Sequence, residues 1–362
     1  MAANDQVGSP NSGSQATARR NMVPIVAGQS ISLFGDYVAF FTLPYYMLSL
    51  TGEALDLGLT AFAETLPMIL FGLVAGVFLD RLRRLGRALI ATDLIRSGAF
   101  AVLAWFASPA GPDLGVRMAA TTVLAVAFIV GSMSVLFDSG LQSYMTRSLL
   151  DRDLIRANAR LGLARTLALS VGPLVGGLTV TLTGGFAVAF TLNAVTFLAS
   201  ALFLRMITPI TTVGAQVAEG FRTALSAGVR VLYRDPRLRW GTLGGTLTNL
   251  VFQPLEALLV LFVAQEVLGI DDIASVASRE GAAVGAFIAL QAAVGSIGVA
   301  FAAKVSKRLP LGSMYALGLA LLGSGFLAVV VVRSWVAVIP AGLAITGVTW
   351  VNVALMTLRQ KL

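Results

Sequence analysis

Long apolar stretches, each followed by a short polar connection, succeed one another along most of the 362-residue chain. An α-helix needs about 20 predominantly apolar residues to cross the hydrocarbon core of a bilayer. Ten stretches reach that length and predict membrane-spanning helices at residues 24–50, 57–79, 88–107, 116–142, 161–183, 186–206, 239–265, 281–303, 311–332 and 335–357. The connections 50–57 and 184–186 leave room only for tight turns between antiparallel helices. The pattern therefore predicts an all-α membrane protein.

Two segments depart from this pattern. Residues 1–20 are rich in Ser, Gly, Asn and Ala and have little to bury, which predicts a disordered tail. The longest connection, 207–238, separates six predicted helices (21–206) from four (239–362). An amphipathic helix on the inner membrane surface, or alternatively a solvated linker helix, is indicated there by an apolar face made of Phe221, Leu225, Val229 and Leu232.

The composition removes most classes of enzyme. With 57% hydrophobic and only 12% charged residues, the chain has more apolar side chain than a soluble core of this size would hide. It has no cysteine and no histidine, which excludes thiol chemistry, histidine acid–base catalysis and histidine-ligated zinc. A phosphate-binding Gly-Lys-Ser/Thr loop is missing as well, which excludes a fused ATP motor. We predict no enzymatic activity, no catalytic residues, no metal and no cofactor.

The basic residues predict the orientation. If the N-terminus is cytoplasmic, the outer connections hold only three of the 26 Lys and Arg residues, namely Arg117, Arg279 and Arg333. Inner connections of membrane proteins carry an excess of Lys and Arg. We therefore expect a multi-pass protein of the cell (inner) membrane with a cytoplasmic N-terminus and tail. The net charge of +8 does not indicate nucleic acid, because the basic residues lie between apolar runs of bilayer length.

The stretch GVFLDRLRRLGR, residues 76–87, carries a family resemblance. The loop signature Gly-x-x-x-Asp-Arg-x-Gly-Arg-Arg of major facilitator superfamily transporters is matched at Gly76, Asp80, Arg81 and Arg84. Arg83 and Leu85 depart from it, standing where the signature has glycine and a basic residue. A faint repeat, with Gly298 before a second basic turn, agrees with the two-half helical bundle of that superfamily.

Further stretches resemble proton-coupled exporters of the superfamily. The Gly-Pro-x-x-Gly end of their fifth-helix signature is matched in SVGPLVGGL by Gly172, Pro173 and Gly176. Leu161 and Ala168 occupy earlier glycine positions of that signature. The bacterial drug and siderophore branch, which includes macrolide and enterobactin exporters, is similar in the pieces GDYVAFFTLP, TDLIRS, LIRANARLGLARTLALSVGP, YRDPRLR and QPLEALL.

The resemblance implies roles for these residues. Asp80 would act as a conformational latch against the basic side chains beside it and the positive N-terminal end of a helix from the other half. The alternative is a local ion pair with Arg84. Asp93 and Arg96, one turn apart at the start of the third helix, would join the latch. The fifth-helix glycines would permit close helix contact and Pro173 would bend the span, with plain helix packing as the alternative.

Acidic side chains inside the predicted spans are candidates for proton coupling and for a cavity. Burying a charged group in the bilayer costs at least about 2.5 kcal/mol, so such groups face protein or water. Three polar helix faces contain these acids: Gln29, Ser32 and Asp36 on the first helix; Thr246, Asn249, Gln253 and Glu256 on the seventh; and Ser134, Asp138 and Gln142 on the fourth. We expect the first two to face an aqueous cavity between the halves.

Simpler roles remain open for each acid. Asp36 and Glu256 would then pair structurally, and Asp138 would lie in the inner headgroup zone. Glu64, about seven residues into the second span, is assigned no role because it falls near the predicted outer interface.

The predicted function is secondary active transport by alternating access, with export of an amphipathic small molecule in exchange for protons. The alternatives are a proton-coupled importer of a small metabolite and a non-transporting membrane remnant. We expect a monomer in the lipid bilayer whose partners are protons and a small-molecule substrate, without nucleic acid.

The superfamily plan has twelve helices, and the final TLRQKL resembles the loop into the eleventh. We therefore also expect a truncated transporter, without helices 11 and 12, that transports little unless a partner supplies them.

Overall fold

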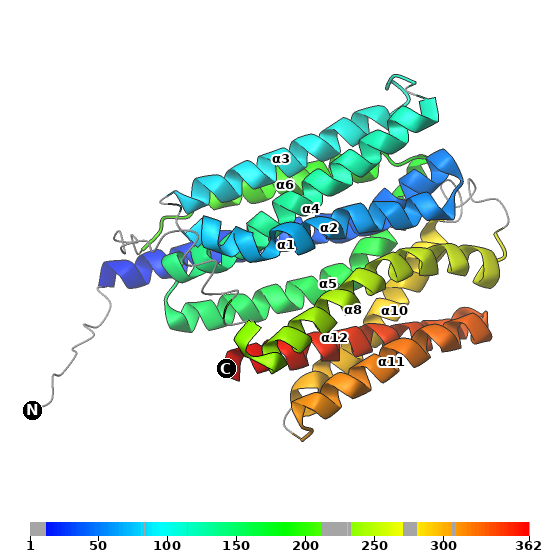
Figure 1. Ribbon diagram of the computed structural model, residues 1–362. Helices are drawn as coiled ribbons and strands as arrows, with labels where there is room; N and C mark the ends of the chain where they lie inside the picture. Colours follow the sequence, from blue (N-terminus) through cyan, green and yellow to red (C-terminus); the bar gives the residue numbers. More distant parts are fainter. Residues whose placement is uncertain are drawn as a thin grey trace, which may run out of the picture.

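The computed structural model describes residues 12–80, 82, 84–113, 115–210, 230, 233–270, 281–305 and 308–361, and these contain helices and no strand (Figure 1). The first six helices are α1 (Ser12–Thr51), α2 (Ala54–Asp80), α3 (Leu85–Phe106), α4 (Gly115–Ser148), α5 (Asp151–Thr183) and α6 (Ala187–Arg205). The remaining ones are α8 (Pro236–Phe262) with the π-turn η1 (Val263–Val267), α10 (Gly281–Val305), α11 (Leu311–Val332), the short η3 (Trp335–Ala337) and α12 (Val338–Lys361). The all-α prediction is confirmed.

Every predicted span coincides with a helix of the structure. Within the described residues, eight helices are long and apolar enough to cross a membrane by length and composition. The α8 helix is absent from that set, and the apolar part of α10 covers only Ala282–Gly298.

The expected hairpin turns are present, with Gly52 and Gly184 both at positive φ where α1 and α5 end. Only a residue without Cβ adopts that backbone geometry at no steric cost.

Several helices extend beyond the apolar stretches that predicted them. The α4 helix continues to Ser148 instead of residue 142, and α5 begins at Asp151 instead of residue 161. The extensions are helical because their apolar side chains pack together at this end of the molecule, in a cluster that includes Met145, Leu149 and Ala157. Tertiary packing stabilises helix beyond the length that a bilayer requires.

The disordered tail was predicted too long, because residues 12–20 belong to α1. Asn21 fixes this segment: its side-chain amide donates to the carbonyl oxygens of Ser148 and Thr208, at 3.0 and 2.7 Å. The N–H group of Thr208 in turn donates to the Asn21 carbonyl oxygen. Residues 1–11 and most of the predicted amphipathic helix (211–229, 231 and 232) lie outside the described part of the chain.

We divide the helices into α1 to α6 and α8 to α12 and call these the first and second bundles; α5 lies between them, packed on α1 and on α10 (Figure 1). The bundles meet where α5 packs on α10 and α2 packs on α8. We call the end of the molecule near Arg84 the basic end, and the end near Gly52 and Gly184 the turn end. The predicted division of the chain into an N-terminal half, a linker and a C-terminal half stays a prediction.

Contact between the bundles is concentrated at the turn end. One apolar cluster there joins Tyr45 and Phe186 of the first bundle to Ala264 and Val284 of the second. The hydroxyl of Thr181 on α5 also accepts a hydrogen bond from the N–H group of Ala282 at the start of α10, at 3.0 Å. At the basic end, each bundle has a cluster of its own. The described residues therefore close the structure at its turn end.

Candidate functional site

A cavity of about 390 Å³ lies between the bundles, enclosed by α1, α2, α4, α8 and α10. Among the described residues, its walls contain three carboxyl groups, from Glu64, Asp138 and Glu256, and no Lys or Arg side chain. The rest of the lining is largely apolar or aromatic, including Phe40, Phe41, Tyr45, Met68 and Ile288. Concave, mostly apolar pockets with a few convergent polar groups are the usual form of small-molecule sites.

Glu256 is the acid that the second bundle contributes to the cavity. It is only 6% exposed, and its carboxylate accepts a hydrogen bond from the side-chain amide of Gln291 on α10. The amide oxygen of Gln291 has no partner among the described residues. An amide carries both donors and an acceptor, so the same side chain can donate to a carboxylate or, after turning over, accept from a carboxylic acid.

Glu64 and Asp138 face the cavity from the first bundle. Glu64 is held close to α4, because its backbone lies directly over Gly131, where an added Cβ would overlap the Glu64 carbonyl group. The sequence analysis placed Glu64 near the outer membrane interface and gave it no role. It did not anticipate that Glu64 lines the cavity. The available signal was a lone acid in an otherwise apolar span, which is a functional candidate by default. Asp138 lies one turn from Ser134 on α4, and both line the cavity.

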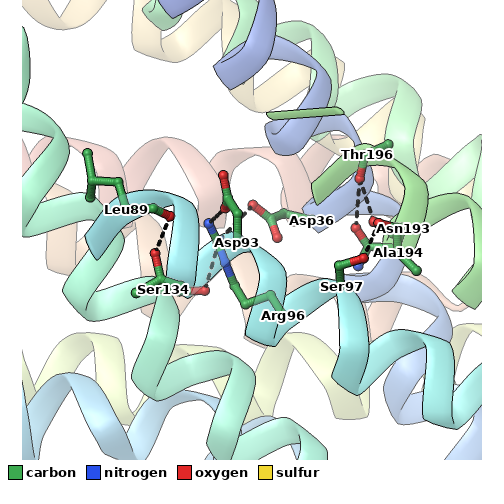
Figure 2. A network of polar contacts seen from close by, with 10 residues as sticks. Asp36, Leu89, Asp93, Arg96, Ser97, Ser134, Asn193, Ala194 and Thr196 are labelled. Atoms are coloured by element: carbon green, nitrogen blue, oxygen red, sulfur yellow. Dashed lines mark hydrogen bonds and ion pairs between the residues drawn. The ribbon is translucent and has the colours of Figure 1, made fainter. Parts of the chain in front are cut away.

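Arg96 on α3 connects several helices of the first bundle (Figure 2). It is 2% exposed and pairs with Asp93 one turn earlier on its own helix. Its guanidinium also lies 4.0 Å from the carboxylate of Asp36 on α1 and makes a long hydrogen bond of 3.4 Å to the hydroxyl of Ser134 on α4. Ser134 lines the cavity, so this network reaches the cavity wall.

Two aromatic rings enclose the Arg96 guanidinium. Its central carbon lies 4.5 Å from the ring centre of Phe137 on α4 and 4.2 Å from that of Phe197 on α6. A planar guanidinium stacks on aromatic faces, and the attraction is stronger where water is excluded. The buried charge is therefore compensated by the carboxylates of Asp93 and Asp36 and by the two aromatic rings.

The fifth-helix glycines lie against α1. A Cβ at Gly172 would lie 2.6 Å from Cβ of Tyr37, and one at Gly176 would lie 3.2 Å from side-chain atoms of Phe41 and Thr42. On the other side of α5, a Cβ added at Gly285 of α10 would lie 2.6 Å from the carbonyl oxygen of Pro173. These small residues let α5 pack tightly between α1 and the second bundle.

The family model of the Major Facilitator Superfamily matches residues 25–362 of the chain. The chain belongs to the Major Facilitator Superfamily. It is accordingly a multi-pass membrane protein of a family of transporters, which are not enzymes, in agreement with the sequence-based prediction. The resemblance on which that prediction rested is confirmed for the superfamily, while the drug and siderophore branch remains a proposal.

Known members of the superfamily resemble the chain to different degrees. The multidrug efflux pump Tap of Mycolicibacterium fortuitum is 26% identical over 235 residues, which cover 62% of this chain and 55% of Tap. The chain thus spans little more than half the length of that relative. A crystal structure of a mutant of the nucleoside transporter NupG aligns with a TM-score of 0.66 at 13% identity, covering 94% of this chain and 82% of NupG.

An inward-facing bacterial homologue of the iron transporter ferroportin aligns with a TM-score of 0.64 at 15% identity, covering 95% of this chain and 84% of the homologue. At such identities these likenesses establish the Major Facilitator Superfamily fold alone.

Part of the polar face predicted on the first helix lies elsewhere than expected. Gln29 and Ser32 are buried and do not line the cavity. They lie on the part of α1 that packs within the first bundle, where Gly28 and Gly35 allow close contact with α6. Asp36 faces Arg96 and does not line the cavity either. Helical spacing determines which residues share a face, but packing decides which neighbour that face meets.

On the seventh predicted span, now α8, the amide of Asn249 donates to the side-chain oxygen of Asn352 on α12 at 3.2 Å. Asn249 thus ties two helices of the second bundle together and does not line the cavity. The side chain of Gln253 lies outside the described residues.

The superfamily loop signature is only partly visible. Gly76 lies within α2, and Arg84 is exposed just before α3. Arg81 and the side chain of Asp80 lie outside the described part, so the latch remains a prediction. Asp93 and Arg96 contact each other, and Arg96 lies near Asp36. Arg96 follows Arg84 by twelve residues along α3, which separates the two by roughly 18 Å along the helix axis.

Proposed function

We propose that this transporter exports amphipathic small molecules in exchange for protons by alternating access. The hydrogen bond between Glu256 and Gln291 at the cavity wall carries the proposal. A carboxyl group beside a substrate cavity can bind a proton in one conformation and release it in another, which links the proton gradient to substrate movement.

Gln291 lowers the free-energy cost of proton exchange at Glu256. Leaving a buried polar group unsatisfied costs about 1–3 kcal/mol. Gln291 is itself buried, and its amide can serve the charged carboxylate as a donor and the neutral acid as an acceptor. Glu256 therefore keeps a hydrogen-bond partner in both protonation states.

Asp36 is a second candidate for proton exchange. Its carboxylate lies at the edge of ion-pair distance from Arg96, whose closer partner is Asp93. A proton on Asp36 would thus leave the Arg96–Asp93 pair intact. Asp138 and Ser134 face the cavity beside this network and would contribute to substrate binding.

The substrate class and the direction are supported by two further observations. The aromatic and aliphatic cavity walls fit a molecule with an apolar body, and a relative bears the description of a multidrug efflux pump. The closed turn end gives the starting conformation of the cycle. In the proposal, the two bundles then rock about the α5–α10 and α2–α8 contacts, and Asp80 latches the basic end.

The proposal is tested with the purified chain in liposomes that carry an imposed pH gradient and a panel of fluorescent amphipathic substrates. We expect substrate movement against the proton flow, abolished in Glu256→Gln because this variant keeps the shape but cannot exchange a proton. Glu266→Gln serves as the control, since Glu266 forms an exposed ion pair with Arg333 away from the cavity. Movement in the same direction as protons would indicate import, and normal proton-driven flux in Glu256→Gln would refute its role.

A further inference from the structure

The charge of the cavity is unbalanced. None of the ion pairs in the described part of the chain includes Glu64, Asp138 or Glu256, although all three line the same cavity. Glu256 is buried, Glu64 is partly buried and Asp138 is exposed. A carboxyl group withdrawn from water needs a proton or a positive charge for compensation. The described lining residues include no Lys or Arg, and the cations whose charge acts on Asp138, Arg165 and Arg96, are not among them. A cationic group of a ligand would therefore meet carboxyl groups that have no directly paired cation in this cavity.

Tyr45 gives a second and independent indication of a ligand. Its side chain lines the cavity and is 3% exposed, yet its hydroxyl group has no hydrogen-bond partner among the described residues. The ring is fixed by stacking on Phe41, with ring centres 4.5 Å apart. A buried hydroxyl left without a partner costs free energy, so a fixed and unsatisfied one in a cavity wall marks a position for a polar group of a ligand.

The lining divides into two kinds of surface. Glu64 and Asp138 belong to α2 and α4, whereas Phe40, Phe41 and Tyr45 belong to α1. Glu256, on the opposite bundle, already has Gln291 as a hydrogen-bond donor. The acids of the first bundle are thus the ones that remain for a cationic group, and the α1 rings are available for its apolar body.

We propose that the cavity binds protonated organic amines: the ammonium group lies between Glu64 and Asp138, an N–H group of the amine donates to the Tyr45 hydroxyl oxygen, and the apolar body packs on the α1 aromatic rings. This inference rests on the proposed transport function and specifies its substrate class. It assigns substrate recognition to Glu64, Asp138 and Tyr45 and leaves proton exchange to Glu256. Neutral and anionic amphipathic molecules of the same size are weaker ligands because they make no charge-assisted hydrogen bond to the first-bundle acids.

The test uses three probes with one apolar body and different head groups: 4,4-diphenylbutylamine, 4,4-diphenylbutanol and 4,4-diphenylbutanoate. Binding is measured by calorimetry on the purified chain in lipid nanodiscs at constant pH, without any gradient. Because charge-assisted hydrogen bonds contribute about 1.5–3 kcal/mol, we expect the amine to bind at least about tenfold more tightly than the alcohol. The carboxylate should bind more weakly than both.

Variants separate the roles of the side chains. Glu64→Gln with Asp138→Asn should bring the affinities of amine and alcohol to within about twofold, because the charge-assisted bonds are lost. Tyr45→Phe should weaken amine binding by about three- to tenfold, the effect of one hydrogen bond. The control is Tyr46→Phe, because Tyr46 packs on Phe186 and Phe190 and does not line the cavity. The control should bind all probes as the parent chain does.

The outcomes distinguish this inference from the proposed function. Equal binding of amine and alcohol by the parent chain, or unchanged selectivity in the Glu64 and Asp138 double variant, would overturn it even if proton-driven flux is observed. Selective amine binding without proton-driven flux would leave it standing and refute the proposed coupling. Retention of alcohol binding by each variant shows that the cavity is still folded.

Discussion

Arg96 and Asp36 face one another across α3 and α1, with the guanidinium 4.0 Å from the carboxylate and Asp93 bound on the same guanidinium (Figure 2). One buried cation thus compensates two acids and is itself stacked between the rings of Phe137 and Phe197. Breaking a buried ion pair by removing one partner is far more costly than removing both.

This arrangement predicts that Arg96→Gln destabilises the protein by about 3–5 kcal/mol, because Asp93 and Asp36 lose their shared cation. Adding Asp93→Asn to that variant should recover a large part of the loss. The measurement is thermal unfolding of each purified variant in one detergent, with Arg333→Gln, at an ion pair with Glu266 that is exposed on both sides, as the control. Equal stability of the single and double variants would contradict the network.

Gln291 is predicted to matter for coupling more than for folding. Gln291→Leu keeps a similar volume but removes the donor to Glu256, and a hydrogen bond to a charged group contributes about 1.5–3 kcal/mol. We expect at least a tenfold loss of proton-driven flux, while counterflow exchange of substrate without a gradient is retained. The exposed Gln142, substituted by Leu, is the matched control. Equal losses of flux and exchange would assign Gln291 a structural role instead.

Glycines on α5 should respond in opposite ways to the same substitution. Gly172→Ala places a methyl group against Tyr37 and is expected to cost about 1–3 kcal/mol, the usual effect of overpacking. Gly162→Ala meets no atom within 4 Å, and the higher helix propensity of alanine should stabilise the chain by up to about 1 kcal/mol. Melting temperatures of the two variants test this. A stabilised Gly172→Ala would show that α1 and α5 are not in backbone contact.

Asn21 is predicted to hold the basic end of the first bundle together. Asn21→Ala leaves the carbonyl groups of Ser148 and Thr208 without their donor, which costs about 1–3 kcal/mol for a buried polar group. Faster proteolysis within residues 12–20 should accompany the loss, because Asn21 fixes that part of α1. Asn158→Ala, at an exposed position of α5, should leave both measurements unchanged. Unaltered proteolysis of Asn21→Ala would contradict this prediction.

The sequence by itself determined the helical class, the approximate positions of the spans and the superfamily. These properties are local: apolar length, turn residues and the spacing of a loop signature are visible within short windows. Glu256 was also found in this way, since an acid in an apolar span is conspicuous.

The tertiary structure alone decided which of these groups meet. Gln29 and Ser32 share the predicted face with Asp36, but tight packing of α1 on α6 at Gly28 and Gly35 turns that face into the first bundle. Glu64 reaches the cavity only because α2 lies against Gly131 of α4. Arg96 finds Asp36 60 residues away in sequence. Such pairings depend on side-chain packing between distant helices, and no local pattern of one helix encodes its neighbour's shape.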